Sequence, residues 1–287
     1  MASLKEIKGR ISSVRSTQKI TAAMKMVSSA KLHHTQAETE HTLLYAQELK
    51  DVLNGLLAAG DDINSPFVVQ RPLRTVAIVA CSSNSGLCGA YNSNVWRKLS
   101  ERILYYKKEN INVRLLPVGK KIAENLRREG YTYDNQFVNT ADKLDYAKST
   151  RLAAELMRLY ASKEVDKVEL LYHHFKNTAV QVMTDMTYLP LSVQADSNDG
   201  KNVVEDYIYE PSVEQLQEML FPKLLNLTVY TTLLDALTAE HAARMMAMQI
   251  ADDNANDLAQ DLTLQYNKSR QQVITNELLD IVGGSMH

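Results

Sequence analysis

The chain has 287 residues, with 32 Lys and Arg against 34 Asp and Glu, and this net charge near −2 argues against a general nucleic-acid binder. Hydrophobic residues at 45 % and charged residues at 23 % are ordinary for a folded protein and exclude a largely disordered one. Two cysteines cannot build a disulfide framework and indicate a reducing compartment. No apolar run approaches the ~18 residues that cross a bilayer, and the N-terminus lacks an apolar signal core.

Helix-breaking residues are confined to the middle of the chain. All six prolines lie between Pro66 and Pro222, residues 1–54 contain one glycine, and residues 223–282 contain neither type. This distribution predicts an N-terminal helix over 1–60 and a C-terminal helix over 212–284, with a globular domain over 66–211 between them. Helices of that length, about 80–90 Å at 1.5 Å per residue, need each other or an outside partner to cover them.

Both terminal segments have the apolar periodicity of a coiled coil. The last segment carries a stripe with a spacing of about 3.5 residues per turn, which predicts a shallow left-handed supercoil. The stripe runs from Leu227 to Val273 through His241, Met248, Ala255, Leu258, Leu262 and Tyr266. The first segment opens with Leu4, Ile7, Ile11 and Val14 and continues less regularly through Ile20, Met24 and Val27. Its centre, HHTQAETEHT, is polar and is expected to be solvated or a contact surface.

Charge supports pairing of the two helices. Residues 1–35 carry seven basic residues against Glu6, a net of +6, and residues 223–287 carry four basic against eight acidic residues, a net of −4. Opposite charge favours association, and the compact segment between the helices predicts that they run antiparallel. The alternative is that each charged run is only a solvated face. The first 30 residues are also serine-rich and acid-poor, as in mitochondrial transit peptides, but their apolar stripe favours a structural helix.

The middle of the chain alternates short apolar runs with helical patterns. Strands are predicted at 74–80, 111–118, 167–173 and 179–189, with a further candidate at 131–138. Helices are predicted at 90–108, 120–128 and 143–162. Strand–helix alternation of this kind indicates a Rossmann-like α/β domain with a mostly parallel sheet. The predicted fold class is therefore α/β plus a long antiparallel coiled coil of the N- and C-terminal helices.

The segment CSSNSGLCGAYN (81–92) follows a strand and precedes a helix, where nucleotide-binding folds hold phosphate. It lacks the patterns G-x-x-x-x-G-K-[ST], G-x-G-x-x-G and G-x-S-x-G, so a tight strand-to-helix turn is the preferred interpretation. A nucleotide-binding α/β domain with helical arms remains the alternative.

Other candidate sites are weak. Cys81 and Cys88 have no nearby ligand to complete a metal site and are expected to be buried thiols. The histidine pairs 33/34 and 173/174 do not make good ligand sets, because adjacent side chains diverge. Residues 252–263 begin like a calcium loop but lack its glycine and its last glutamate. No catalytic, cofactor or metal site is therefore predicted, and the architecture is typical of transmission or scaffolding.

Several segments resemble the gamma subunit of F-type ATP synthases, in consistent order from about residue 3 to residue 284. They are ISSVRSTQKITAAMKMVSSAKL (11–32), SGLCGAYN (85–92), DYIYEP (206–211), EHAARMMAMQIADDNANDL (240–258) and YNKSRQQVITNELLDIVGG (266–284). The resemblance implies a non-catalytic rotor shaft that carries torque between a proton-driven c-ring and catalytic beta subunits. It implies a single copy per complex, no cofactor, and the alpha, beta and epsilon subunits and the c-ring as partners. It also implies a peripheral position on the cytoplasmic face of a bacterial inner membrane.

The same resemblance assigns contact residues. Arg270, Gln271 and Thr275 match the family's polar cluster that contacts the beta-subunit catch loops, and Met24 matches a residue facing the beta-subunit lever region. Tyr207, Tyr209 and Glu210 match the foot near the c-ring loops and the epsilon subunit. A cytoplasmic coiled-coil scaffold unrelated to ATP synthase is a further alternative, and it would not associate with alpha and beta subunits.

Overall fold

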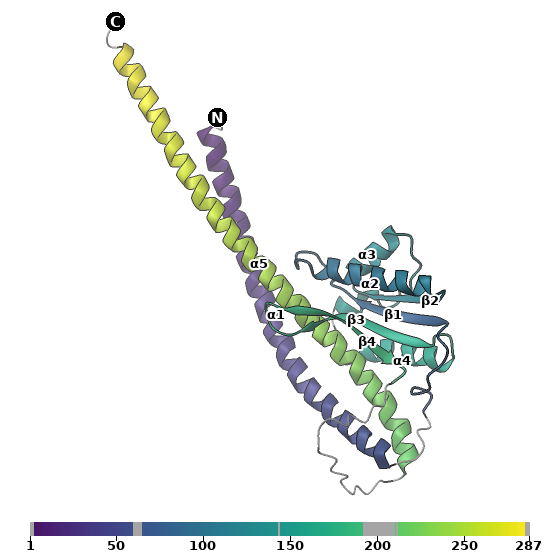
Figure 1. Ribbon diagram of the computed structural model, residues 1–287. Coiled ribbons are helices and arrows are strands. Elements are labelled where there is room, and N and C mark those ends of the chain that lie inside the picture. Colours follow the sequence, from purple (N-terminus) through teal and green to yellow (C-terminus); the bar gives the residue numbers. More distant parts are fainter. Residues whose placement is uncertain (1–2, 60–64, 143, 192–209, 211, 285–287) are drawn as a thin grey trace. The chain divides into compact units, whose positions relative to one another are not determined.

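The computed structural model describes residues 3–59, 65–142, 144–191, 210 and 212–284, and Figure 1 shows the order of the elements. Two long helices, α1 (Leu4–Ala59) and α5 (Val213–Gly284), enclose the remaining elements in the sequence. Between them come β1 (Thr75–Cys81), α2 (Tyr91–Lys108), β2 (Asn112–Val118), α3 (Lys120–Arg128), the 3-10 helix η1 (Val138–Asp142), α4 (Tyr146–Ala161), β3 (Lys167–Phe175) and β4 (Gln181–Leu189). The predicted fold class, with long terminal helices around an α/β domain, is confirmed.

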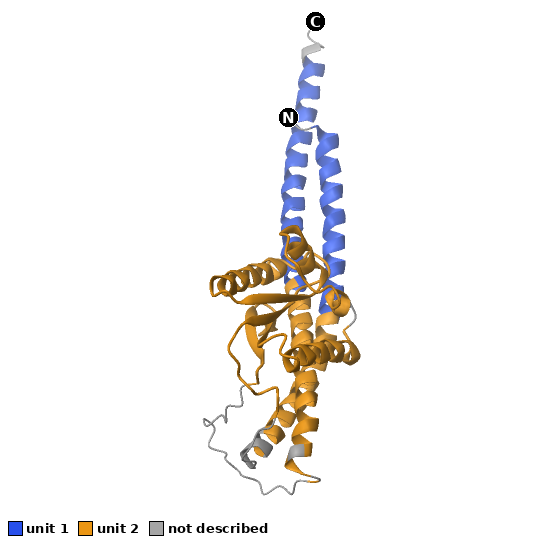
Figure 2. Cartoon of the chain, turned by 90° about the vertical axis from the view of Figure 1, so that its right-hand side faces the viewer, with its two compact units in different colours: residues 1–30, 244–287 blue, residues 31–243 orange. Residues whose placement is uncertain are grey.

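The chain divides into two compact units, which Figure 2 shows in different colours. The first unit, called the tip unit here, combines residues 1–30, which include the first part of α1, with residues 244–287, which include the last part of α5. The second, called the body unit, contains residues 31–243 and therefore the whole sheet with the adjoining parts of both long helices. No helix in the described residues combines the length and hydropathy of a membrane-spanning segment.

The sheet of the body unit has the strand order β2-β1-β3-β4. β1 pairs in parallel with β2 and β3, whereas β4 joins β3 antiparallel through a short hairpin. β1 is buried on both faces, with residues 76–80 almost fully inaccessible, as expected for a central parallel strand. The prediction of a mostly parallel sheet is thus correct, with one antiparallel strand at the edge.

Each face of the sheet has its own apolar cluster. On one face, Ile78 of β1 packs with Leu99 of α2 and Leu126 of α3. On the other face, Val79 packs with Leu156 of α4 and with the apolar side of α5 at Leu225 and Leu233. The α/β domain is therefore a three-layer structure, and α5 supplies part of its core.

The candidate strand at 131–138 is not a strand. This segment runs irregularly before η1, although the Asp134 backbone N–H donates to Leu115 O of β2 at 2.9 Å. Gly130 in the left-handed region (φ 76°) redirects the chain before it, and Asp134 caps its own turn by accepting from Gln136 N. The segment therefore follows the edge of β2 without forming a ladder. The helix predicted at 143–162 is the shorter α4.

Candidate functional site

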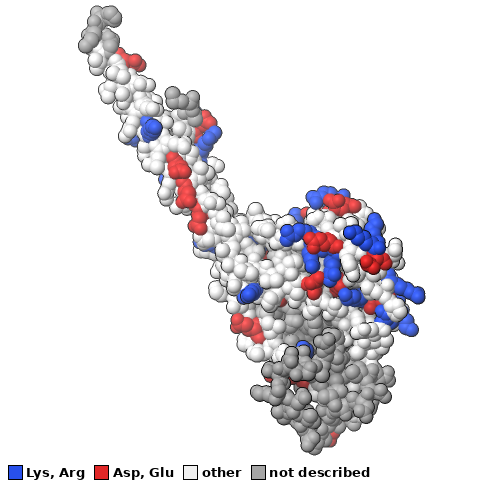
Figure 3. Space-filling model, viewed as in Figure 1, with Lys and Arg blue, Asp and Glu red and all other residues white. Residues whose placement is uncertain are grey.

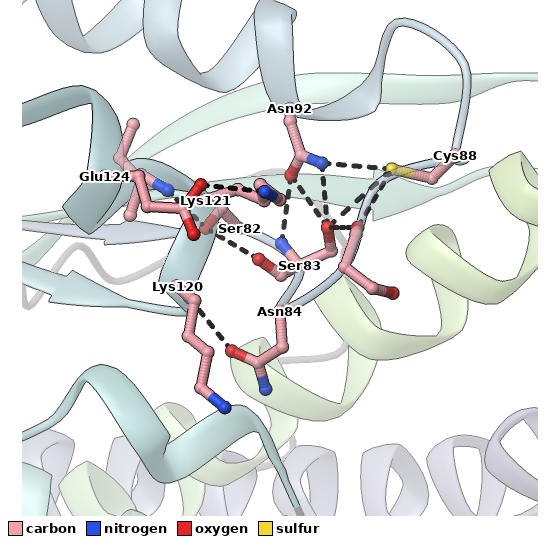
Figure 4. A network of polar contacts seen from close by, with 10 residues as sticks. Ser82, Ser83, Asn84, Cys88, Asn92, Lys120, Lys121 and Glu124 are labelled. Atoms are coloured by element: carbon pink, nitrogen blue, oxygen red, sulfur yellow. Dashed lines mark hydrogen bonds and ion pairs between the residues drawn. The ribbon is translucent and has the colours of Figure 1, made fainter.

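The strand-to-helix turn 82–92 is held together by its own polar groups, as Figure 4 shows. The Ser83 N–H donates to Asn92 Oδ1 at 3.1 Å, and Asn92 Nδ2 donates to Ser83 Oγ at 2.8 Å and to Cys88 Sγ at 3.1 Å. Asn92 lies in the first turn of α2, and its side-chain amide both accepts hydrogen bonds from the preceding loop and donates to it. These groups serve the structure of the turn, in agreement with the sequence interpretation.

The N-terminus of α3 lies beside this turn and is also occupied by protein oxygens. Its backbone donates from Lys120 to Asn84 Oδ1 at 2.9 Å, from Lys121 to Ser83 O at 3.1 Å, and from Ile122 to Ser82 Oγ at 3.0 Å. Helix N-terminal amides are the groups that bind phosphate in nucleotide-binding folds. Because those amides are already bonded to the loop, the N-terminus of α3 is not available to a phosphate group.

Cys81 and Cys88 are free and buried, as predicted. Burial raises the pKa of the Cys81 thiol to about 12, which keeps it protonated and unreactive at neutral pH. His173 and His174 are neighbours on β3 and lie on opposite faces, His173 buried and His174 half-exposed. Residues 252–263 are helical, and the described part of the chain contains no metal-binding cluster of His, Cys, Asp or Glu.

In the tip unit the two long helices pair antiparallel. Lys25 Nζ of α1 donates to Gln249 Oε1 at 2.9 Å and lies 3.8 Å from Asp252 Oδ2, both on α5. The other basic residues of this part of α1 are exposed, so charge complementarity contributes less to the pairing than the net charges suggest.

The contact face of α1 differs from the predicted stripe. Ile20 and Val27 are exposed, whereas Thr21 and Ser28 are buried. The spacing of three and four residues that begins at its first apolar positions continues without a break, through Leu4, Ile7, Ile11, Val14, Gln18, Thr21, Lys25 and Ser28. Helix geometry selects the face by spacing, and small polar residues are tolerated there when their own backbone satisfies them. Thr21 Oγ1, for example, donates to Gln18 O at 2.9 Å.

The polar centre of α1 belongs to the body unit and is a contact surface on one side. Thr35 and Thr39 are buried, and the hydroxyl oxygens of Thr39 and Thr238 of α5 lie 3.3 Å apart. Thr39 Oγ1 also donates to Thr35 O at 2.7 Å, while His33 and His34 are exposed. The sequence left two expectations for this segment, a contact surface or a solvated one. The side with the threonines is a contact surface, and the side with the histidines is solvated.

The α5 stripe is buried at Met248, Ala255 and Leu262, but Leu258 and Val273 are exposed. Ala259 replaces Leu258 on the contact face, because a straight helix drifts relative to a strict heptad. With Lys25 opposite Asp252 and α1 beginning at Leu4, antiparallel pairing ends near position 273 of α5. The last turns of α5 therefore continue alone within the tip unit (Figure 2).

Of the seven sequence-predicted contact residues, four lie in the tip unit, one lies in the body unit and two lie outside the described residues. Arg270, Gln271 and Thr275 are exposed near the unpaired end of α5, and Thr275 Oγ1 donates to Gln271 O at 2.9 Å. Met24 is partly buried on α1. Glu210 is exposed, and Tyr207 and Tyr209 lie outside the described residues.

Two polar clusters of the body unit escaped the sequence analysis. Asp235 of α5 accepts from the Phe175 backbone N–H at 2.8 Å, and its other oxygen lies 2.7 Å from His174 Nδ1. Glu169, buried in the middle of β3, accepts from the Tyr106 hydroxyl at 2.5 Å and from Lys167 Nζ at 2.7 Å. An acidic residue inside an otherwise apolar run, as in LLDAL and KVELL, is the signal that marks such positions.

A sequence profile of the ATP synthase family matches residues 3–286. The chain is 60 % identical over 285 residues to the ATP synthase gamma chain of Parabacteroides distasonis, with 99 % of both chains covered. It is 53 % identical over 288 aligned positions to the ATP synthase gamma chain of Phocaeicola vulgatus, with 100 % of both covered. The chain belongs to the ATP synthase gamma-chain family.

A solved structure supports the fold assignment for this gamma-chain family member. A chain of the Euglena gracilis mitochondrial ATP synthase in rotational state 3 matches with a TM-score of 0.64 at 19 % identity, and the match covers 99 % of this chain and 93 % of that chain. At this identity the likeness concerns the fold. Family membership was predicted from the terminal motifs and is confirmed, whereas the roles of individual contact residues stay predictions.

Proposed function

We propose that this chain is the non-catalytic rotor shaft of a proton-translocating ATP synthase, passing torque between the c-ring and the catalytic beta subunits. A single copy assembles with the alpha, beta and epsilon subunits and the c-ring on the cytoplasmic face of the bacterial inner membrane. The helices over 1–60 and 212–284 form the shaft, and the α/β domain over 66–211 forms the foot. The gamma-chain relatives at 60 % and 53 % identity and the F1/c-ring assembly named for the Euglena structure support this assignment.

The unpaired end of α5 is the observation that carries the proposal. Its exposed aliphatic side chains include Ile274, Leu278, Leu279 and Ile281. A helix end this apolar needs an outside surface to cover it, because a soluble monomer rarely leaves such a patch in water. A ring of subunits around the tip supplies that surface and leaves the rest of the shaft free to transmit rotation.

Polar residues at the start of this end would provide directional contacts with the ring. Arg270 and Gln271 are adjacent and project about 100° apart, while Gln271 and Thr275 share one side of the helix. All three are exposed. They can therefore contact two neighbouring subunits at once, Arg270 by a charge-assisted bond to a carboxylate and Gln271 by amide hydrogen bonds. Met24 would add an apolar contact on the α1 side.

Replacement of Arg270 and Gln271 by alanine tests these contacts. We expect the double variant to assemble but to lose most of its turnover, because breaking a desolvated arginine–carboxylate pair costs about 2–5 kcal/mol. ATP synthesis and multisite hydrolysis are measured in reconstituted complex at matched subunit stoichiometry. Lys268→Ala, an exposed cation on the same turns, is the matched control. Unchanged turnover in the double variant would refute the contact role of these residues.

Thr275→Val is a milder test of the same cluster. The change is nearly isosteric and removes a hydroxyl whose hydrogen bond is already made to the Gln271 carbonyl. We expect a smaller loss of turnover than in the double variant. A loss as large as that of Arg270→Ala with Gln271→Ala would place the main contact at position 275.

The absence of catalysis by this chain is tested directly with purified protein. The 81–92 turn lacks the glycine and lysine patterns of phosphate loops, and the backbone amides of the neighbouring α3 N-terminus are already bonded to loop oxygens. We expect neither retention of labelled ATP nor hydrolysis by the isolated chain. Turnover that a point change such as Asn92→Ala abolishes would overturn the proposal and restore the nucleotide-binding alternative.

The foot contacts require a coupled assay. We propose that Tyr207, Tyr209 and Glu210 lie at the c-ring and epsilon surface. Alanine at all three positions should reduce ATP-driven proton pumping while hydrolysis by detached F1 stays normal. Retention of epsilon during purification, compared between variant and parent, reports whether the epsilon contact is affected. Normal pumping with normal epsilon retention would contradict this placement.

A further inference from the structure

The α/β domain and α5 are joined by apolar contacts along one side of the helix. Leu225, Val229, Leu233 and Ala236 recur every three or four residues and enter the core cluster that contains Val79 of β1. Apolar burial selects the face of the helix that packs on the domain, but it is non-directional, so it fixes the rotation of the helix about its own axis less sharply than oriented hydrogen bonds do. If α5 is to transmit torque without rotating relative to the α/β domain, directional contacts between the two are needed in addition.

Three directional contacts join α5 to the α/β domain, within the body unit. The Tyr188 hydroxyl of β4 donates to Leu225 O at 3.2 Å, and the Tyr91 hydroxyl of α2 donates to Ala236 O at 2.9 Å. Between them, Asp235 contacts the end of β3 through Phe175 N and His174 Nδ1. The contacts span residues 225–236, about 16 Å of helix. Of these three contacts, that of Asp235 is made through a charged side chain, and each of its oxygens is bonded to one of two adjacent residues of β3.

The setting of Asp235 distinguishes it from a surface ion pair. Its side chain is 13 % exposed, whereas that of His174 is 52 % exposed. Burial raises the pKa of the Asp235 carboxyl, while the bonds from His174 and Phe175 act in the opposite direction. Burial is the main cause of the raised pKa values of Tyr172 on β3 and Tyr91 on α2, and the charge of Asp235 adds to both, for Tyr91 less than that of Glu240. Burial disfavours the charged form of the carboxyl at this position, and the hydrogen bonds from His174 and Phe175 favour it. The value of a carboxylate here therefore lies in these two oriented hydrogen bonds.

We infer that Asp235 is a positioning residue that clasps the α/β domain to α5, so that domain and helix rotate together. This inference rests on the proposed shaft function. It concerns a contact inside the chain, separate from the contacts of Arg270 and Gln271 with surrounding subunits. These contacts of Asp235 with Phe175 and His174, called the clasp here, matter when torque acts on the complex, because different partners then drive the domain and the helix.

The test uses the assembled complex in inverted membrane vesicles and compares ATP-driven proton pumping with ATP hydrolysis. Loss of a charge-assisted hydrogen bond shifts an equilibrium by about tenfold or more. In Asp235→Leu we therefore expect pumping per ATP hydrolysed to fall severalfold while hydrolysis is retained. Asp235→Asn keeps the shape and an acceptor for Phe175 N, and should restore most of the ratio. Glu101→Leu, at an exposed acidic position on α2, is the matched control.

His174→Leu provides a second variant because His174 is half-exposed and its replacement leaves the core in place. It removes one of the two bonds and should give a smaller fall in the same ratio than Asp235→Leu. An unchanged ratio in an assembled Asp235→Leu complex refutes the clasp. If that complex does not assemble, an unchanged ratio in His174→Leu refutes it instead. If vesicles carrying the unaltered chain do not pump at all, the shaft function itself fails.

Discussion

The α/β domain and the tip unit achieve their order in different ways. Residues 76–80 of β1 are almost fully inaccessible, and two apolar clusters cover the faces of the sheet. In the tip unit the contact face includes Gln18, Thr21, Lys25 and Ser28, and the last turns of α5 have no opposing helix. On the face shown in Figure 3, basic and acidic side chains are interspersed over the α/β domain and form no single-sign patch. The domain, with the part of α5 that packs on it, is therefore stabilised by a buried apolar core, whereas the proposed shaft function assigns the exposed end of the tip to contacts with other subunits.

Removal of a core side chain from the domain should give the largest effect. Leu99 is fully buried between α2 and the sheet, and Leu99→Ala should cost about 2–5 kcal/mol of unfolding free energy through lost transfer energy and a residual cavity. Leu264→Ala on the exposed side of α5 should stay within about 0.5 kcal/mol. Urea unfolding followed by fluorescence of Trp96, the single tryptophan, reports on the domain. Equal losses would contradict the contrast between domain and tip.

Two glycines sharpen the comparison. A Cβ at Gly119 (φ 103°) would lie 2.1 Å from Ser82 O, so Gly119→Ala should destabilise the domain by roughly 3 kcal/mol. Gly9 lies inside α1 with nothing within 4 Å of an added Cβ, so Gly9→Ala should stabilise the helix by about 1 kcal/mol. Chemical denaturation measures the first change and hydrogen exchange of α1 amides the second. The two changes in stability are expected to have opposite signs. If both variants were destabilised or both stabilised, the explanation by backbone strain at Gly119 or by helix propensity at Gly9 would fail.

Acid should weaken the domain through His173. This ring is buried and stacks on Tyr91 with centroids 4.4 Å apart, and burial lowers its pKa from 6.5 to about 4. The unfolded chain therefore binds a proton near pH 6.5 that the folded chain refuses until about pH 4. Stability is full above pH 6.5 and falls toward pH 4, by at most about 3 kcal/mol. His173→Phe should retain the stack and remove this part of the acid sensitivity in pH-dependent urea melts, whereas His33→Phe at an exposed site should leave it intact.

The smallest expected effect concerns the charge contact of the tip. Lys25 is partly exposed and lies 3.8 Å from Asp252, so Lys25→Met should cost about 0.5 kcal/mol or less. The cost should shrink at 1 M salt, where the screening length is about 3 Å. Hydrogen exchange of the α5 amides around Asp252 is the measurement, with the exposed Lys8→Met as control. A loss of several kcal/mol that shrinks strongly at 1 M salt would show that the opposite net charges of the two helices do govern their pairing.

The spacing and composition of the sequence were sufficient to predict the helices and strands, and its motifs were sufficient to predict the family. The lack of glycine and proline in the flanks predicted α1 and α5, and the apolar runs predicted β1 to β4 to within a few residues, because these signals are local and periodic. The terminal motifs were long enough to identify the gamma-chain family. These features can be predicted without knowing which segments of the chain contact one another in the folded protein.

The tertiary structure decided which residues face which. The α1 contact face uses Thr21 and Ser28 instead of Ile20 and Val27, because the position of the opposing helix outweighs side-chain polarity. Segment 131–138 lies along β2 without joining the sheet, since a ladder depends on the partner strand as much as on local apolarity. The contact of Asp235 with His174 joins positions 61 residues apart, and only the folded chain brings their hydrogen-bonding groups together.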